Sequence, residues 1–569
     1  MGHLMAGAAR QVTHAYDAIV VGSGISGGWA AKELCEKGLK TLVLERGPDI
    51  RHVTDYDTAL KDPWQLPYNN RVTQDDRKAQ PVQSTLYLYD QSTKAHFVDD
   101  RRDTYVQEQP FNWYRGYQVG GRSLMWARHV FRYSDLDFGA NQREGVGIDW
   151  PVRYADVAPW YEYVERFIGA SGENSGLPQL PAQVLQPPFE MNALEKHIRA
   201  HLATAFGGER RLICSATAVL SREHNGRGPC QGRDQCARGC PFSAYFSSNG
   251  VTLPAAAATG NLTLRPDSIV HSLIYDDATR RVTGVRVIDA RTKQATEYFA
   301  RVVFLCASTL NSTAILLNSR PARFPEGLGN DSGELGHNLM DHHNGGGATA
   351  SYSGLLDRYY RGRRATSMYI PRFRNVATAE PAFTRGYAYE VYTNRADWTR
   401  GVEGAGFGAA FKDSITRPGE WRLYTEGYGE TLPYHDNRMW LAPDDVDGFG
   451  IPKVHVSMGY RENEKRMARQ MMDDAVEMLA AAKLEDIKGF NHPVTPGSVI
   501  HEMGTARMGR DPATSVLNAW NQLHAVPNVF VTDGSCMPSS PPQNPSLTYM
   551  ALTARAVDHA VEQLKRGAI

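Results

Sequence analysis

The chain has 569 residues, and its 62 basic side chains are balanced by 62 acidic ones. A chain of this length exceeds what one hydrophobic core usually organises, so we expect two or more domains. The sequence contains no basic block, which argues against a nucleic-acid partner because phosphate binding needs clustered Lys and Arg.

Hydropathy gives no sign of a membrane protein. No apolar run approaches the roughly 18 to 20 residues that span a bilayer. Residues 1–10 lack the charged start and the long apolar region of a signal peptide. The chain alone therefore predicts a protein without a membrane span that folds in the cytoplasm.

The first predicted element is a strand, turn and helix that carry a dinucleotide fingerprint. An apolar run breaks into Gly22-x-Gly24-x-x-Gly27 and continues as a helical segment. In such turns the first glycine permits the sharp bend, the second lets the backbone approach a pyrophosphate, and the third lets the helix pack on the strand. The N–H groups and positive dipole end of the helix would face the phosphates. A packing turn without a ligand is the alternative.

A second predicted strand, 41–44, ends in an acidic residue. Glu45 follows Gly27 at close to the ~20-residue spacing expected of a carboxylate that binds the ribose hydroxyls of a dinucleotide. Farther along, Gly120 and Gly121 form a loop in which the absence of a β-carbon would let the backbone approach a ligand closely. The nucleotide-binding elements are scattered along the chain, which predicts a discontinuous domain.

Periodicity predicts further helices and strands after this loop. We expect helices at 156–169, 192–206 and 467–482, and strands at 262–265, 282–289, 300–307 and 528–531. From 352 to 456 the pattern changes to short alternating strands and aromatic loops, which predicts an antiparallel sheet that could wall a substrate cavity. Its segments 387–392, 421–430 and 437–440 mix aromatic side chains with carboxylates and amides. Such walls suit sugars, although aromatic-rich strands are also ordinary core.

Three of the seven cysteines, Cys230, Cys236 and Cys240, fall within eleven residues. A structural zinc site usually needs four ligands in paired spacing, and no matching pair is evident nearby. Disulfides fit poorly with an odd trio in a chain without a signal peptide. Three thiolates can instead hold an iron–sulfur cluster that lacks one corner iron. The spacing favours such a [3Fe-4S] cluster, with zinc, reduced thiols or partial disulfides as alternatives and Cys214 as the one plausible fourth ligand.

The C-terminal region carries the residues with acid–base chemistry. Neutral imidazole suits removal of a hydroxyl proton, because the reference pKa of histidine is about 6.5, so His501 is the candidate base. The Asn544 carboxamide would orient the substrate hydroxyl and stabilise developing alkoxide charge. The alternative for any lone histidine is a surface or satisfied core residue. Together with the fingerprint, these residues predict removal of a proton and a hydride from an alcohol.

Several separated motifs in order resemble the glucose-methanol-choline (GMC) oxidoreductase family over almost the whole chain. They are the N-terminal fingerprint, the Gly120-Gly-Arg-Ser loop, the segment 336–342, and the blocks around His501, Asp533 and Asn544. The resemblance implies an α/β fold: a discontinuous doubly wound, Rossmann-like FAD-binding domain and a substrate domain with an antiparallel sheet. The expected FAD-binding domain comprises 13–60, 110–145, 205–345 and 495–569. The substrate domain comprises 61–109, 146–204 and 346–494.

The resemblance also implies which residues bind FAD. Besides the fingerprint glycines and Glu45, the expected contacts are Ser26, Arg46, Gly120, Gly121, Ser123, Trp126, Val270, Asp533, Gly534, Pro545 and Thr548. Family members that bind FAD covalently carry a histidine where this chain has Met125. A thioether cannot form that histidyl bond, so non-covalent FAD is expected.

The cysteine spacing is similar to the catalytic subunit of bacterial FAD-dependent glucose and glycoside dehydrogenases. This implies a carbohydrate substrate, a [3Fe-4S] relay, a cytochrome c acceptor and a small chaperone-like subunit that carries the export signal. Such a partner would allow a periplasmic location without a leader in this chain. The alternatives are an oxidase that uses O₂ and, more remotely, a flavin-containing lyase or isomerase.

Overall fold

The computed structural model describes residues 12–358, 367–396, 406–416 and 418–569. Within them, seven strands form a mixed sheet in the order β5-β2-β1-β8-β7-β6, with β16 paired to β8. Strands β1, β2, β5, β8 and β16 run parallel, and β6 and β7 extend the sheet in antiparallel fashion. The bounds are β1 (Val12–Val21), β2 (Thr41–Leu44), β5 (Leu262–Arg265), β6 (Ser268–Asp276), β7 (Arg281–Asp289), β8 (Ala295–Leu305) and β16 (Val529–Val531).

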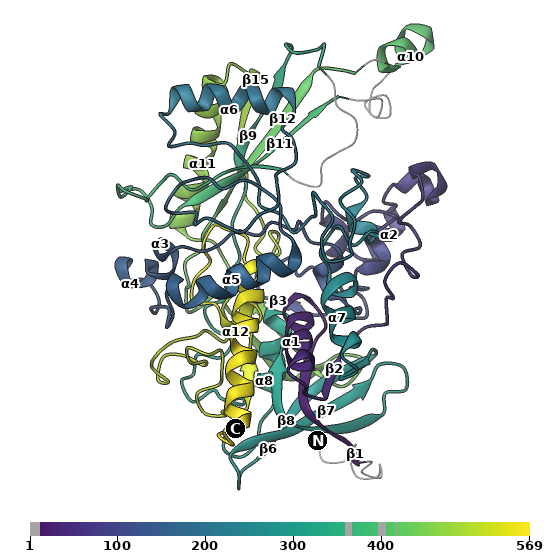
Figure 1. Cartoon of the computed structure of the whole chain (residues 1–569), viewed down its shortest axis with the longest axis vertical. Coiled ribbons are helices and arrows are strands. Elements are labelled where there is room, and N and C mark those ends of the chain that lie inside the picture. Colours follow the sequence, from purple (N-terminus) through teal and green to yellow (C-terminus); the bar gives the residue numbers. More distant parts are fainter. Residues whose placement is uncertain (1–11, 359–366, 397–405, 417) are drawn as a thin grey trace.

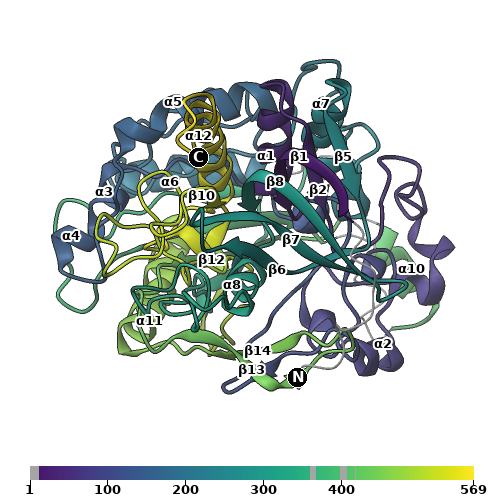
Figure 2. The same cartoon turned by 90° about the horizontal axis from the view of Figure 1, so that it is seen from below.

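Helices cover both faces of this sheet (Figure 2). Helices α1 (Ile25–Glu36), α7 (Leu253–Ala258) and α12 (Ser546–Lys565) lie on one face, and α5 (Tyr154–Ile168) packs on α12. Helix α8 (Thr309–Asn318) covers the other face. Since both faces are covered, the strands can be apolar throughout, and all four residues of β2 are buried. This is the expected doubly wound arrangement, assembled from stretches far apart in the sequence.

An antiparallel sheet lies at the other end of the molecule (Figure 1). Its order among the described strands is β15-β9-β12-β11-β10-β4, and α6 (Ala193–Ala205) and α11 (Glu462–Ala481) accompany it. The bounds are β4 (Ile213–Cys214), β9 (Gly346–Tyr352), β10 (Met368–Ile370), β11 (Tyr387–Arg395), β12 (Trp421–Gly429) and β15 (Glu485–Asn491). Alternate residues of β11, such as Tyr387 and Tyr389, enter a core with Met467 and Met471 of α11. The period of two sends the intervening residues to the opposite face.

Most predicted helices and strands are confirmed, but the predicted extent of the antiparallel sheet is wrong. Strands β2 and β5 have the predicted bounds, and α5 and α6 match within two residues. Strands β13 (Arg438–Val446) and β14 (Pro452–Ser457), expected in the antiparallel sheet, instead form their own sheet with β3 (Val106–Gln107). They pack on α8 and so help to bury its apolar residues. The exact domain boundaries stay a prediction.

The shorter α-helices include α2 (Gln74–Ala79), α3 (Asp135–Phe138), α4 (Ala140–Glu144) and α10 (Gly408–Thr416). In the part of the chain that the structure describes, no helix has the length and apolar character needed to cross a membrane.

Candidate active site

A single cavity of about 900 Å³ reaches from the glycine-rich turn before α1 to the face of the antiparallel sheet that carries Glu390 and Glu426. This volume is at the upper end of the range of ligand pockets, so it suits a large ligand. Fourteen of the predicted site residues line it. They are Gly22, Gly24, Ser26, Glu45, Arg46, Gly121, Ser123, Trp126, Val270, His501, Asp533, Gly534, Asn544 and Pro545.

Three predicted cofactor residues lie behind the cavity wall. A β-carbon on Gly27 would lie 1.9 Å from the Gly22 carbonyl oxygen, so Gly27 serves helix packing. The Gly120 N–H donates to Ser23 Oγ at 2.9 Å. The Thr548 hydroxyl pairs with that of Tyr161 at 2.8 Å. These residues shape the wall and are not among those that line the cavity.

The turn between β1 and α1 has the geometry of a phosphate cradle. Gly22 has φ +92°, and a β-carbon there would lie 2.5 Å from the Cys306 carbonyl oxygen. A β-carbon on Gly24, in contrast, would meet no atom within 4 Å, because it would point into open space. Gly24 thus leaves room for a ligand at the N-terminus of a 12-residue helix, where N–H groups and the dipole favour anions.

Glu45 is held at the end of β2 by this turn. Its carboxylate accepts hydrogen bonds from the backbone N–H of Ser23 (3.1 Å), the Ser23 hydroxyl (2.6 Å) and the N–H of Gly47 (3.1 Å). Burial raises the pKa of Glu45, and these hydrogen bonds oppose that rise. The carboxylate remains on the cavity wall, within the βαβ unit expected for ribose binding.

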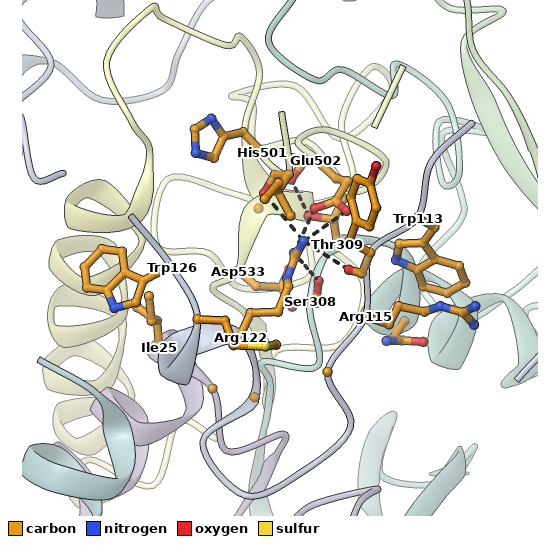
Figure 3. Close-up of a pocket in the computed structure, with 18 of the residues that line it drawn as sticks. Ile25, Trp113, Arg115, Arg122, Trp126, Ser308, Thr309, His501, Glu502 and Asp533 are labelled. Carbon is orange, nitrogen blue, oxygen red and sulfur yellow. Dashed lines mark hydrogen bonds and ion pairs between the residues drawn. The ribbon is translucent and has the colours of Figure 1, made fainter. Parts of the chain in front are cut away.

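An ion pair stands beside the candidate base (Figure 3). The Arg122 guanidinium binds both carboxylate oxygens of Glu502 at 3.1 and 2.8 Å, and it also donates to Ser308 Oγ at 3.1 Å. Burial alone would lower the pKa of Arg122, but the charge of the buried Glu502, its hydrogen bonds and further nearby groups together outweigh that effect, so the pKa is raised. Such a bidentate ion pair fixes the orientation of the guanidinium plane. The sequence-based prediction did not single out either residue, although Glu502 directly follows His501.

His501 lines the cavity and is tied to a second histidine. Its Nδ1 lies 2.9 Å from Nδ1 of His342, whose Nε2 lies 2.7 Å from the carbonyl oxygen of Pro541. The backbone N–H of His501 donates to Asp341 at 2.9 Å. Burial, followed by the charges of His342, Arg122 and His129, lowers the pKa of His501 well below its ordinary value. The ring is therefore neutral at pH 7, as proton abstraction requires.

Asn544 faces the cavity beside the antiparallel sheet. Its side chain donates a hydrogen bond to Glu390, a buried carboxylate of β11 whose Oε1 lies 2.7 Å from His129 Nδ1. Burial alone would raise the pKa of Glu390, but the His129 charge and the hydrogen bonds from Tyr392 and Asn544 outweigh it, and the pKa is lowered. Glu390 is therefore ionised and holds the Asn544 amide in place.

The sheet supplies a wall of paired carboxylates and tyrosines. Glu390 pairs with Glu426 of β12, and Tyr392 pairs with Tyr424, so all four share one face. These residues and Tyr428 line the cavity. They belong to the segments 387–392 and 421–430 that were predicted as walls. The third segment, 437–440, does not line this cavity, although Leu441, the next residue of β13, does.

The cysteine loop lies outside the cavity. Cys230, Cys236 and Cys240 are half-buried and free of disulfides. Burial raises the pKa of the Cys230 thiol, with Cys236 and Cys240 close enough to add to the effect. Over the described ranges, no three or more His, Cys, Asp and Glu side chains are grouped to hold a metal ion. Cys214 lies in the core of the antiparallel sheet. The structure therefore does not support the predicted cluster site.

The cavity fits a dinucleotide such as FAD. The open space at Gly24 and the carboxylate of Glu45 lie at one end, and His501 and Asn544 line the other part. The buried Tyr549 hydroxyl on the same cavity wall has no hydrogen-bond partner within the described part of the chain. An unpaired buried hydroxyl is costly, and a bound polar ligand would supply the missing partner.

Comparison with known proteins gives two family matches. The N-terminal model of the GMC oxidoreductases matches residues 16–344, and the C-terminal model matches residues 433–553. The chain is 28% identical to 2-methyl-1,2-propanediol dehydrogenase of Mycolicibacterium austroafricanum, covering 95% of this chain and 94% of that protein. It is also 28% identical to the fructose dehydrogenase large subunit of Gluconobacter japonicus, covering 97% and 98%.

A solved structure supports the fold. The crystal structure of pyridoxine 4-oxidase from Mesorbium loti superimposes with a TM-score of 0.60 at 18% identity, covering 96% of this chain and 99% of the other. At that identity the likeness concerns the arrangement of the two sheets and their helices.

Proposed function

This chain belongs to the GMC oxidoreductase family, FAD-dependent enzymes that act on CH–OH groups, and on that premise we propose that it oxidises a sugar or glycoside hydroxyl to a carbonyl. The observation that carries the proposal is the single cavity that contains the nucleotide turn, His501 with Asn544, and the wall of β11 and β12. The relatives that act on fructose and on a diol are consistent with a polyhydroxylated substrate.

The wall side chains favour a carbohydrate. Tyrosine rings offer faces for stacking on a sugar ring, and carboxylates accept hydrogen bonds from hydroxyls. Glu426 accepts from the Gly345 N–H at 3.3 Å and keeps acceptor capacity toward the cavity. Glu390 and Glu426 lie directly opposite each other, so they could bind neighbouring hydroxyl groups of one sugar.

The chemistry assigned to the chain is removal of the hydroxyl proton. The substrate O–H bond breaks as an N–H bond forms at His501 Nε2. The Asn544 side chain orients the substrate oxygen and is itself held by Glu390. Bound FAD would supply the acceptor for the carbon-bound hydrogen and its electron pair, and loss of both hydrogens would leave a carbonyl. Arg122 places positive charge near this end of the cavity.

The proposed electron acceptor is an external one such as cytochrome c, reached with the help of a small partner subunit that also exports the enzyme to the periplasm. This part rests on the resemblance of the cysteine loop alone. The alternative is an oxidase that passes electrons to O₂. Anaerobic incubation with a panel of free sugars and glycosides, followed by O₂ or a dye acceptor in parallel, tests both. Dye reduction faster than O₂ consumption supports the dehydrogenase, and the reverse supports the oxidase.

FAD is expected to be bound without a covalent link. Met125 lines the cavity where covalent relatives carry the linking histidine, and a thioether cannot form that bond. Acid precipitation of the yellow protein should therefore release FAD into the supernatant. Flavin that remains with the pellet would contradict this expectation.

An iron–sulfur cluster on Cys230, Cys236 and Cys240 stays a proposal from their spacing. Among the described residues, no three or more His, Cys, Asp and Glu side chains are grouped to hold a metal ion. If the cluster forms, anaerobically prepared protein contains iron and acid-labile sulfide, and Cys236→Ser lowers cytochrome-coupled turnover far more than flavin reduction by substrate. Protein that contains zinc or no metal would show that these cysteines do not hold an iron–sulfur cluster.

A further inference from the structure

We propose that His342 is a positioning residue that keeps His501 in the tautomer with a bare Nε2 facing the cavity. This inference rests on the proposed role of His501 as the base. It adds a second histidine, 159 positions away in the sequence, which does not itself touch the substrate.

The two rings form a directed chain of hydrogen bonds. His342 is fully buried, its Nε2 lies 2.7 Å from the Pro541 carbonyl oxygen, and its Nδ1 lies 2.9 Å from Nδ1 of His501. The ring planes are inclined by 82°. This places one nitrogen of each ring toward the other, and the His342 ring does not line the cavity.

The proton positions follow from the chemistry of the partners. A carbonyl oxygen can only accept, so Nε2 of His342 must carry a proton. Burial lowers the pKa of His342 to about 4, so the ring is neutral at pH 7 and its Nδ1 is bare. A bare Nδ1 can only accept, and the proton between the rings must belong to His501 Nδ1. Since His501 is also neutral, its Nε2 has a free lone pair.

The opposite tautomer of His501 would be inactive as a base. It would present an N–H group to the substrate and would bring two bare Nδ1 atoms together at 2.9 Å. The hydroxyl proton can form its new N–H bond only with the bare nitrogen. Loss of tautomer control at a catalytic imidazole can cost up to about 10⁴-fold in kcat.

The backbone around both rings holds them in this geometry. Asp341 accepts from the backbone N–H groups of His501 (2.9 Å) and Val499 (3.1 Å). The Tyr460 hydroxyl donates to the His342 carbonyl oxygen at 3.0 Å. Figure 3 shows the His501 ring directed away from the Arg122–Glu502 ion pair, so that pair does not supply the tautomer control.

Two substitutions separate this role from simple packing. His342→Leu removes both hydrogen bonds while keeping an apolar side chain of moderate size. His342→Asn keeps an oxygen near the Nδ1 position that can accept from His501. We expect His342→Leu to lower the rate constant of anaerobic flavin reduction at saturating sugar by about tenfold or more, within the 10⁴-fold limit for a wrong tautomer. The substrate dissociation constant should change little, and His342→Asn should restore most of the rate.

A double-mutant cycle with His501→Ala is the decisive control. If His342 acts through His501, adding His342→Leu to His501→Ala causes no further loss of rate. Equal losses in both backgrounds would overturn the inference and leave His501 as the base. A His501→Ala variant with a near-normal rate would instead overturn the proposed function. FAD content and melting temperature are measured for every variant. If His342→Leu does not bind FAD, the role of His342 is tested instead by the flavin-reduction rate of His342→Asn and by the ¹⁵N spectra of histidine-labelled protein.

A spectroscopic readout tests the tautomer without turnover. In protein labelled with ¹⁵N-histidine, the His501 signals, assigned by their loss in His501→Ala, should show a protonated Nδ1 and a bare Nε2. His342→Asn should retain this pattern, and His342→Leu should show a mixture of both tautomers. A protonated Nε2 in the wild-type protein at neutral pH would overturn the inference.

Discussion

Replacing His501 with alanine is expected to leave FAD bound and to slow flavin reduction by sugar at least about 10²-fold, the lower range for losing a general base. The residues that form the nucleotide turn lie elsewhere on the cavity wall, so the flavin spectrum should persist. Rapid mixing of the variant with sugar under anaerobic conditions measures the rate directly.

His559→Ala is a matched control for this change. His559 lies on α12 and stacks on Trp520 with 4.3 Å between ring centroids, away from the residues that line the cavity. Its loss should leave the reduction rate near that of the wild type. If His501→Ala also reduces its flavin at the normal rate, another group removes the proton and the assignment of His501 is wrong.

Gly24→Val is expected to give a folded protein that binds FAD more weakly. Gly24 has an extended backbone, φ −67° and ψ −158°, which valine adopts readily, and the new side chain would enter open space. That space is the proposed place of the pyrophosphate. We expect FAD affinity to fall at least about tenfold, which corresponds to about 1.4 kcal/mol of binding free energy. Titration of apoprotein with FAD, followed by flavin fluorescence, measures the change.

Gly228→Val provides the same substitution outside the cavity. A β-carbon on Gly228 also meets no atom within 4 Å, and its φ is not in the left-handed region. FAD affinity should be unchanged in this variant. Equal affinity in Gly24→Val and wild-type protein would show that no ligand group occupies the space beside Gly24.

The glycine-rich turn could be predicted from sequence because its determinants are local. Gly22 and Gly27 contact each other's backbone within one turn, and Glu45 ends the next parallel strand. Gly120 and Thr548 lie beside cavity residues in the sequence, but they are not among the residues that line the cavity. The Gly120 N–H bonds to Ser23 and the Thr548 hydroxyl to Tyr161, so contact of either residue with FAD stays a prediction.

The rest of the site depends on contacts that no local pattern records. Alternation in 387–392 and 421–430 predicts one polar face on each strand. It does not predict that Glu390 and Glu426 stand opposite each other, which depends on the register of β11 and β12. The contact of His342 with His501 likewise needs the folded chain. Strand β13 alternates like its neighbours, yet its place is decided by packing on α8.

Anaerobic mixing of the FAD-loaded protein with sugars and glycosides, each also prepared with deuterium at every carbon, shows directly whether the protein oxidises such a substrate. We expect that at least one of them bleaches the yellow flavin, that bleaching is slower with the deuterated sugar, and that the product carries a new carbonyl. A flavin that remains oxidised with every sugar and glycoside, while FAD is bound and the protein is folded, would contradict this proposal.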